Sequence, residues 1–280
     1  LKDNMHYFQG KSAGKIRLVP VLHFRQHESW AEFKIGMNTL YVLRDVQGFV
    51  HQLERHARVR YGKKLEVLLD RGVFSEESVP IVDFVARAVR ELSRMESPLL
   101  QRDPRKLFLT PRLLDELLGL REKEEILVHT GHIRSMGVLS EDPRLDVWIQ
   151  RQEGGVLLQS EFFELMEGAD RLIIQSGEFV YRCGDEYSHQ MGAFLNYSAK
   201  APGQQFFVAD SDLPVLVTAL LPTLQRYCNV EMEEGTLAEF MPEPAQVQIY
   251  IEEGTADLLE CRIETSYGEK TYNVFEPVRL

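Results

Sequence analysis

This chain of 280 residues lacks any long apolar run, any clustered cysteines and any complete nucleotide-binding motif. No apolar segment approaches the roughly 18–20 residues that a membrane-spanning helix requires, and no secretory signal sequence opens the chain. We therefore expect a cytoplasmic protein that makes no contact with a membrane. The chain begins with Leu1 rather than methionine, and we interpret it as a fragment of a longer protein.

Cysteine is scarce, and the three residues of this type lie far apart, at Cys183, Cys228 and Cys261. A structural zinc site requires several Cys or His ligands at close spacing, and an odd number of cysteines cannot pair completely into disulfides. We predict buried free thiols in a reducing compartment, and no metal site.

Motifs that carry catalysis are scarce as well. Gly10-Lys11-Ser12 imitates part of a phosphate-binding loop, but the complete loop has another glycine five positions earlier, where this chain has Met5. His129 and His132 flank a glycine turn without a nearby cysteine or carboxylate pair to complete a metal site. We predict a hairpin whose two histidines face the solvent, no catalytic residue and no cofactor bound by this chain.

Positive charge is scarce in the second half of the chain. Residues 141–280 hold 9 Lys and Arg against 25 Asp and Glu, whereas residues 1–140 hold 23 against 18, which gives net charges of −16 and +5. A basic surface attracts phosphate groups and an acidic surface repels them. Two interpretations stay open: the basic half contacts nucleic acid, or both halves carry ordinary solvated charge.

The candidate nucleic-acid-binding residues form two basic groups in the first half. Exposed Lys and Arg side chains bind phosphates, and an aromatic residue between them, here Tyr61, can stack on a base. Acidic residues such as Glu66 and Asp103 lie among them and reduce the local positive potential. The first group comprises Arg55, Arg58, Arg60, Lys63 and Lys64, and the second comprises Arg102, Arg105 and Lys106.

The hydrophobic pattern predicts an α+β fold, in which helices pack on small antiparallel sheets in two lobes. Apolar alternation predicts a hairpin from residues 16–24 and 30–37, a third strand at 40–43 and alternating strands from Val247 to the end. We divide the chain into a basic α+β lobe at 1–120 and an acidic α+β lobe at 121–280.

Capping residues mark the predicted helix starts. Asp45 precedes an apolar face at helical spacing, and Thr110 stands before Pro111, the position where a proline fits a helix best. The clearest signal for the start of a helix is the pair Ser75-Glu76, which follows Phe74. The helices that we predict after these and later caps include 75–93, 110–119 and 210–224, the last of them opened by Asp210.

Seven segments carry a resemblance to a known family. They are Tyr41-Val42-Leu43, Tyr61-Gly62-Lys63, Phe74-Ser75-Glu76, Leu109-Thr110-Pro111, Gly177 to Tyr181, Leu220-Leu221-Pro222, and the tail from Ile249-Tyr250-Ile251 to Tyr267-Gly268. Together, over about residues 40 to 280, they resemble the helicase-associated domain of bacterial Swi/Snf-type ATPases.

The resemblance implies a setting for this chain. In the family, this region looks like a body between an N-terminal zinc-binding module and a C-terminal ATPase motor. It implies a non-catalytic accessory domain that positions duplex DNA or regulates the motor of the same chain, whose parent is a DNA-dependent, helicase-like ATPase involved in ATP-dependent remodelling. ATP and Mg²⁺ are then expected only in the motor, and zinc only in the N-terminal module. The alternative is a protein-interaction scaffold that uses the acidic half.

Overall fold

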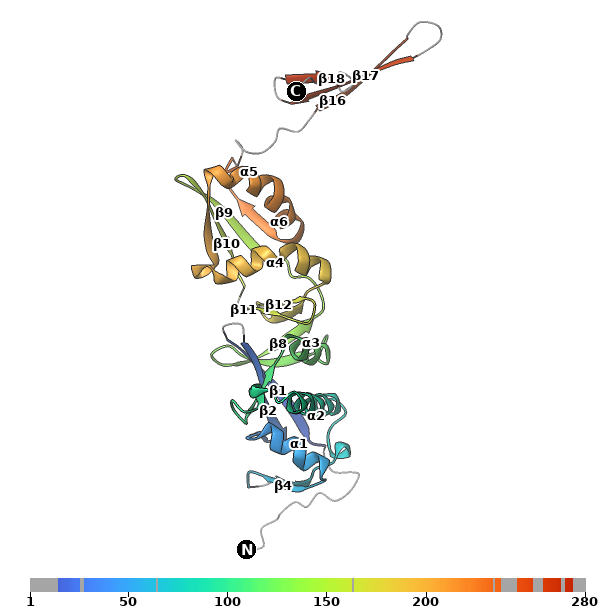
Figure 1. The fold of residues 1–280 in the computed structure, drawn as a ribbon, viewed down its shortest axis with the longest axis vertical. Coiled ribbons are helices and arrows are strands. Elements are labelled where there is room, and N and C mark those ends of the chain that lie inside the picture. The colour runs from blue at the N-terminus through green and yellow to red at the C-terminus, as the bar shows by residue number, and fades with distance from the viewer. Residues whose placement is uncertain are drawn as a thin grey trace.

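The computed structural model describes residues 15–25, 28–63, 65–162, 164–233, 235–237, 246–253, 259–267 and 270–273. Helices pack on several mixed and antiparallel sheets (Figure 1). This arrangement confirms the predicted α+β class. No helix among these residues is long and apolar enough to cross a membrane.

The largest sheet has nine strands in the order β11-β12-β13-β8-β7-β1-β2-β3, with β6 also paired to β2. Most neighbours are antiparallel, but β1 pairs with β7, and β8 with β13, in parallel. The strands are β1 (Arg17–Arg25), β2 (Glu28–Gly36), β3 (Leu40–Val42), β6 (Lys106–Leu109), β7 (Glu125–His129), β8 (Ile133–Leu139), β11 (Glu164–Glu167), β12 (Leu172–Ser176) and β13 (Phe179–Arg182).

Helices α1 (Val46–Glu54), α2 (Val79–Arg94) and α3 (Pro111–Gly119) pack on one face of this sheet and form the first hydrophobic core. Strand β2 shows this one-sided packing. Its residues Ala31, Phe33 and Ile35 point to the face covered by the helices and have no exposed surface, whereas the residues between them point to the other face and are half-buried. The predicted hairpin and third strand are therefore confirmed. Two of the predicted caps are confirmed as well: Asp45 accepts a hydrogen bond from the Gly48 amide at 2.8 Å, and Thr110 caps α3.

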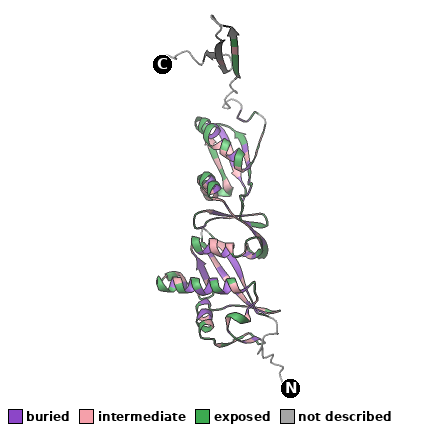
Figure 2. Ribbon diagram, turned by 90° about the vertical axis from the view of Figure 1, so that its right-hand side faces the viewer, coloured by how far each residue is buried: buried purple, intermediate pink, exposed green. Residues whose placement is uncertain are grey.

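A second hydrophobic core lies around the four-stranded sheet β14-β10-β9-β15. Buried residues, shown in purple in Figure 2, gather on strands and on one side of the helices in both cores. The elements of this part are β9 (Asp146–Gln152), β10 (Gly155–Ser160), β14 (Gln205–Ala209), β15 (Asn229–Met232), α4 (Asp185–Lys200), α5 (Leu213–Val215), a π-helical segment η5 (Leu216–Leu220) and α6 (Leu221–Tyr227).

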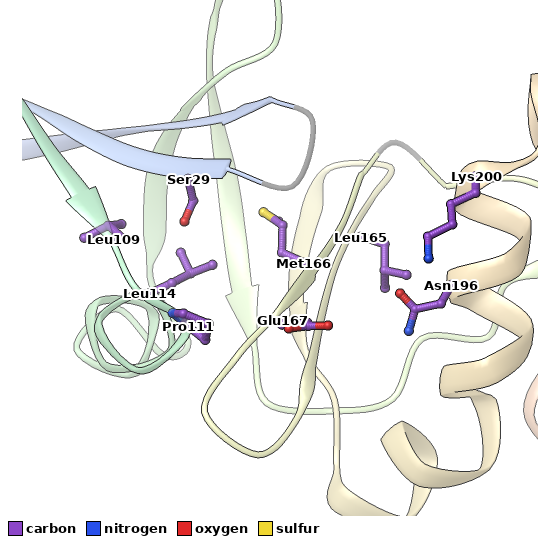
Figure 3. A pocket seen from close by; sticks show the side chains of 9 residues that line it. All are labelled: Ser29, Leu109, Pro111, Leu114, Leu165, Met166, Glu167, Asn196 and Lys200. Atoms are coloured by element: carbon purple, nitrogen blue, oxygen red, sulfur yellow. The ribbon is translucent and has the colours of Figure 1, made fainter. Parts of the chain in front are cut away.

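Strands β11 and β12 lie between the two cores. Met166 and Ile173 belong to the first core, and their neighbours Leu165 and Ile174 belong to the second. A strand that is buried on both faces requires such consecutive apolar residues. A cavity of about 280 Å³ remains at this junction, lined by Met166 and Leu165 together with residues of β6, α3 and α4 (Figure 3).

The two smaller sheets are β4-β5 and β16-β17-β18, and the second of these confirms the predicted strands of the tail. Short 3-10 turns η1, η2, η3 and η4 connect other elements. The bounds are β4 (Arg58–Tyr61), β5 (Leu65–Leu68), β16 (Gln246–Glu253), β17 (Leu259–Tyr267), β18 (Lys270–Asn273), η1 (Arg71–Val73), η2 (Pro98–Leu100), η3 (Pro202–Gln204) and η4 (Asp210–Asp212).

The division into lobes at 1–120 and 121–280 stays a prediction. The first core contains residues from both sides of that boundary, since Met136 and Val138 of β8 pack together with Leu22 of β1.

Helix α2 begins later than predicted. The sequence signal placed its start at Ser75, but the helix begins at Val79, with Ser78 as its N-cap residue. The Ser75 amide donates to the Ile16 carbonyl at 2.8 Å, and the Ser78 hydroxyl accepts a hydrogen bond from the Leu18 amide at 3.0 Å. The polar groups of Ser75 and Ser78 are therefore hydrogen-bonded to Ile16 and to Leu18 of β1. A capping motif that begins at Ser75 would need the Ser75 amide for itself.

The helix predicted for 210–224 is present, but it is not one regular α-helix. The segment contains η4, α5, η5 and α6 in succession, and the Leu221 amide donates to Leu216, five residues earlier. Pro222 has no amide hydrogen, so the regular ladder cannot continue there. Asp210 is not a cap either: its carboxylate accepts a hydrogen bond from the Arg151 guanidinium at 2.6 Å.

Two of the three cysteines have the predicted state. Cys183 and Cys228 are buried free thiols, and burial raises the pKa of both, to about 11 for Cys228. The side chain of Cys261 lies outside the described residues.

Candidate nucleic-acid interface

The first basic group lies at the end of α1 and on the β4–β5 hairpin that follows it (Figure 1). Arg55 is the C-cap residue of α1, Arg58 and Arg60 alternate along β4, and Lys63 lies in the turn. All four side chains are exposed. Lys64 lies outside the described residues.

The β4–β5 hairpin is amphipathic, which fixes the direction of its cations. Leu65 and Val67 of β5 belong to the first core, and Val59 and Tyr61 of β4 pack against it. Because successive residues of a strand point to opposite faces, the remaining residues of β4, which include Arg58, point away from that core. The hydrophobic core thus holds the cationic face towards solvent.

Tyr61 does not have the predicted stacking role. Its ring packs against the first core, and burial of its hydroxyl raises the pKa of Tyr61 to about 12. The interpretation of Tyr61 as a base-stacking residue is therefore wrong, because its alternation along β4 places it on the core side.

The cations of the hairpin are weakly neutralised. Arg58 has a long ion pair with Glu66, at 3.9 Å, and the Arg60 guanidinium donates to the Lys63 carbonyl at 3.1 Å. Within the described ranges, no acidic side chain forms an ion pair with Arg55, Arg60 or Lys63. Their charge is therefore available to an anionic partner.

The second basic group is neutralised by acidic side chains. Arg102 forms a two-bond pair with Glu28, at 2.9 and 3.2 Å. Asp103 accepts two hydrogen bonds from the Arg105 guanidinium and lies 3.5 Å from Lys106. The hydrogen bonds from the Arg105 side chain, followed by one from the Arg105 backbone amide, hold the pKa of Asp103 well below its usual range. The second group is thus committed to internal ion pairs.

The two groups lie near opposite ends of α1. The Val46 amide, at the start of this helix, donates to the carbonyl of Pro104 at 2.8 Å, and Arg55 follows the last turn. A helix of nine residues is about 13 Å long. The structure therefore does not merge the two groups into one cluster, and the pairing of Arg102 with Glu28 holds the second group at the β1–β2 turn.

A row of aromatic rings crosses the large sheet, and the sequence did not reveal it. His23 of β1 lies directly opposite His129 of β7 and Trp30 of β2, and Trp30 lies opposite Phe108 of β6. The His23 ring stacks on His129 at 4.8 Å and on Trp30 at 5.2 Å between centroids. We call His129, His23, Trp30 and Phe108 the aromatic row.

The prediction for the two histidines of the β7–β8 hairpin was correct for only one of them. His132 is exposed and accepts a hydrogen bond from Arg134, at 2.5 Å. His129 is half-buried in the aromatic row instead of facing solvent. The parallel pairing of β1 with β7 brings these rings together, and no local signal encodes that pairing.

Cations also lie over the aromatic row. The Lys106 ammonium lies 4.8 Å from the centroid of the Trp30 ring, and the Arg102 guanidinium lies 4.2 Å from that of Phe108. Such contacts contribute about 0.5–1 kcal/mol at exposed sites. Arg102 and Lys106 of the second basic group thus contact both an acidic side chain and a ring of the aromatic row.

The described part of the chain contains no group of three or more His, Cys, Asp or Glu residues arranged to hold a metal ion.

The sequence model of a family described as bacterial SNF2 helicase associated matches residues 105–279, which is more than half of the chain. No curated protein matches. The matched range includes Arg105 and Lys106, whereas the β4–β5 hairpin and the resembling segments before residue 105 lie outside it.

Proposed function

Because the chain belongs to the bacterial SNF2 helicase-associated family, we propose that it is an accessory, DNA-contacting part of an SNF2-type helicase. The outward face of the β4–β5 hairpin would bind the phosphate backbone of duplex DNA. The ATPase motor of the same parent protein would hold ATP and Mg²⁺ and perform the turnover, and this chain would position DNA for it. We also propose a cytoplasmic location for the parent protein, because the DNA that it would contact lies there.

The observation that carries the proposal is the exposed and weakly paired charge of the hairpin. Arg58 and Arg60 share one face of a two-stranded ribbon whose other face is anchored in the first core. Two-stranded ribbons fit the major groove, which is about 12 Å wide, and exposed cations bind the phosphates that flank it. A rigid hairpin pays little conformational entropy on binding, which supports a positioning role.

The chain itself has a subsidiary role in this proposal. Its sequence contains no complete phosphate-binding loop, which supports the assignment of ATP hydrolysis to the motor. The predicted zinc module of the parent protein is likewise part of the proposal and is assigned no residue of this chain.

A salt series tests the contact with DNA. The purified chain is titrated with labelled duplex and single-stranded DNA at increasing salt, and binding is followed by fluorescence anisotropy. If about four cations of the hairpin region contact phosphates, the logarithm of the duplex affinity falls against that of the salt concentration with a slope of about −3 to −4. Absence of binding at low salt would exclude the proposed contact.

A second candidate function is binding of the motor through the tail sheet. Val247, Ile249 and Ile251 alternate along β16, and between 58% and 66% of each residue is exposed. A contiguous exposed apolar strip is typical of a protein contact. This strip lies within the range that matches a helicase-associated family, so the motor of the parent protein is the occupant that we assign to it.

Replacing Val247, Ile249 and Ile251 together by threonine tests this second candidate. Threonine keeps the β-branched shape that suits a strand, so we expect unchanged unfolding by urea and roughly tenfold weaker binding to the purified motor, measured by calorimetry. Equal affinity of the variant and the original chain would remove the tail sheet from the motor contact.

A further inference from the structure

A cavity of about 630 Å³ lies where β3 and the start of α1 meet the β4–β5 hairpin. Residues 40–45, from β3 and the loop after it, form one wall, and residues 59–62 of the hairpin form another. Gly48, Phe49 and Gln52 of α1 complete the lining. Because residues of the hairpin line it directly, the cavity adjoins the first basic group.

The charge along this cavity is positive. Arg44 lines it from the β3–α1 loop and Arg60 lines it from β4, and both residues are exposed. Neither guanidinium forms an ion pair with an acidic side chain of the described residues. Of those residues, Asp45 is the only acidic one in the lining, and its carboxylate accepts a hydrogen bond from the Gly48 amide. Two cations against one anion leave a net charge of +1, which favours an anionic ligand.

Two strand edges present backbone donors that the sheets do not use. The Leu43 amide donates to a carbonyl of β2 at 2.8 Å. Since bonded pairs alternate along an antiparallel ladder, the N–H of the preceding residue, Val42, points away from β2. The Leu69 amide likewise donates to the carbonyl just before β4 at 2.9 Å, so the N–H of Arg60 points away from β5. Val42 and Arg60 both line the cavity, and neither amide has a hydrogen-bond partner within the described ranges.

A tyrosine hydroxyl adds another donor. Tyr61 lines the cavity, and its hydroxyl is buried without a hydrogen-bond partner among the described residues. Because burial raises the pKa of Tyr61 to about 12, the hydroxyl keeps its proton at neutral pH and can donate. Buried polar atoms are nearly always paired, so this hydroxyl indicates an acceptor in the cavity. The carboxamide of Gln52 offers two more donor hydrogens at the wall formed by α1.

A close contact fixes the hairpin against β3. Gly62, in the turn of the hairpin, has a φ of 62°, and a Cβ atom added there would lie 2.3 Å from the ring of Tyr41. Only glycine therefore allows the turn to approach β3 so closely. The donors on the two walls are held in place before a ligand arrives, which lowers the conformational entropy lost on binding.

We infer that this cavity seats one phosphate group of the DNA backbone between the guanidinium groups of Arg44 and Arg60. Guanidinium groups bind phosphate through paired, charge-assisted hydrogen bonds, and the amide of Val42 and the hydroxyl of Tyr61 complete the set of donors. This inference rests on the proposed contact of the hairpin with duplex DNA. It extends that contact to Arg44, a residue outside both basic groups.

Arg44→Ala tests the seat directly. We expect roughly tenfold weaker binding of labelled duplex DNA at low salt, in fluorescence anisotropy, because a hydrogen-bonded ion contact is lost. The slope of affinity against salt should become smaller by about one, since one phosphate contact disappears. Unchanged affinity and slope would overturn the inference and leave the hairpin contact intact. Absence of duplex binding by the original chain would overturn the proposed function together with the inference.

Two further variants separate the guanidinium from its charge. Arg44→Lys keeps the charge but loses the planar fork, so we expect about threefold weaker binding with an unchanged salt slope. Lys200→Ala is the matched control, because Lys200 is an exposed cation on α4 and does not line this cavity. Full affinity of Arg44→Lys would overturn a seat built on the guanidinium fork. A loss in Lys200→Ala as large as in Arg44→Ala would show that only net charge matters, and would overturn the seat as well.

Tyr61→Phe tests whether the phosphate enters the cavity. The change keeps the ring and removes the unpaired hydroxyl, so we expect equal or higher stability towards urea. We also expect about threefold weaker binding of duplex DNA, because the phosphate loses a donor. Higher stability with unchanged DNA affinity would place the phosphate outside the cavity and overturn the inference.

A free phosphate anion has the same chemistry as a backbone phosphate, and a competition experiment distinguishes the two. Inorganic phosphate replaces chloride at constant ionic strength in the complex of the chain with labelled duplex DNA. We expect millimolar phosphate to leave the duplex bound, because the cations of the hairpin hold neighbouring phosphates of the same backbone. Displacement of DNA from the original chain but not from Arg44→Ala would assign the site to free phosphate and overturn the assignment to DNA.

Discussion

Charge reversal of the hairpin, by Arg58→Glu together with Arg60→Glu, is expected to weaken duplex DNA binding about a hundredfold at low salt. Both guanidinium groups are exposed on one face of β4, and the ion pair of Arg58 with Glu66 is long, at 3.9 Å. A hydrogen bond to a charged group contributes about 1.5–3 kcal/mol, and each 1.4 kcal/mol is a factor of ten in affinity. Losing two phosphate contacts should also reduce the salt slope by about two.

A matched control carries the same change in net charge far from the hairpin. Lys200→Glu together with Arg226→Glu alters two exposed cations on α4 and α6. We expect this control to bind duplex DNA within about twofold of the original chain, in fluorescence anisotropy at equal salt, because screening limits surface charges beyond about 10 Å. If both double variants lose affinity equally, only the net charge matters and the hairpin is not the contact.

Removal of one carboxylate, by Asp115→Ala, is expected to lower the free energy of unfolding by about 3 kcal/mol. Asp115 of α3 accepts a hydrogen bond from Arg182 of β13 at 2.9 Å and lies 3.7 Å from Arg171. The side chains of Asp115 and Arg182 are only 14% and 13% exposed. Without Asp115, the Arg182 guanidinium keeps its charge in a poorly solvated place, and its remaining partners among the described residues are the Ser140 hydroxyl and, at a longer distance, Glu122.

Glu186→Ala is the control for Asp115→Ala. Glu186 pairs with Arg226 at 2.9 Å, the same distance, but these two side chains are 66% and 65% exposed. Exposed pairs contribute about 0–1 kcal/mol, so urea unfolding should separate the two variants by at least about 2 kcal/mol. Similar losses in both would mean that burial does not strengthen the Asp115 contact.

Features that depend on neighbouring residues could be predicted from the sequence. The β1–β2 hairpin, the caps of α1 and α3 by Asp45 and Thr110, and the strands of the tail all follow from alternation or from capping over a few positions. The α+β class follows from these elements. The family resemblance, too, was already present in short segments of the sequence.

The first basic group could be identified from the sequence only in part. The composition of β4 identified Arg58 and Arg60 as candidates, but the same segment offered Tyr61 as a stacking residue. Only packing on the first core decided that Tyr61 points inwards. The second group was equally basic in sequence, and its neutralisation by Glu28 required a partner 74 residues away.

Features that depend on contacts between distant segments could not be predicted from the sequence. The parallel pairing of β1 with β7 places His129 beside His23, although more than a hundred residues separate them in the chain. Contacts with Ile16 and Leu18 moved the start of α2 from Ser75 to Val79. A capping or alternation signal is local because its hydrogen bonds span a few residues, whereas strand register and ion pairing are fixed only when the whole chain has packed.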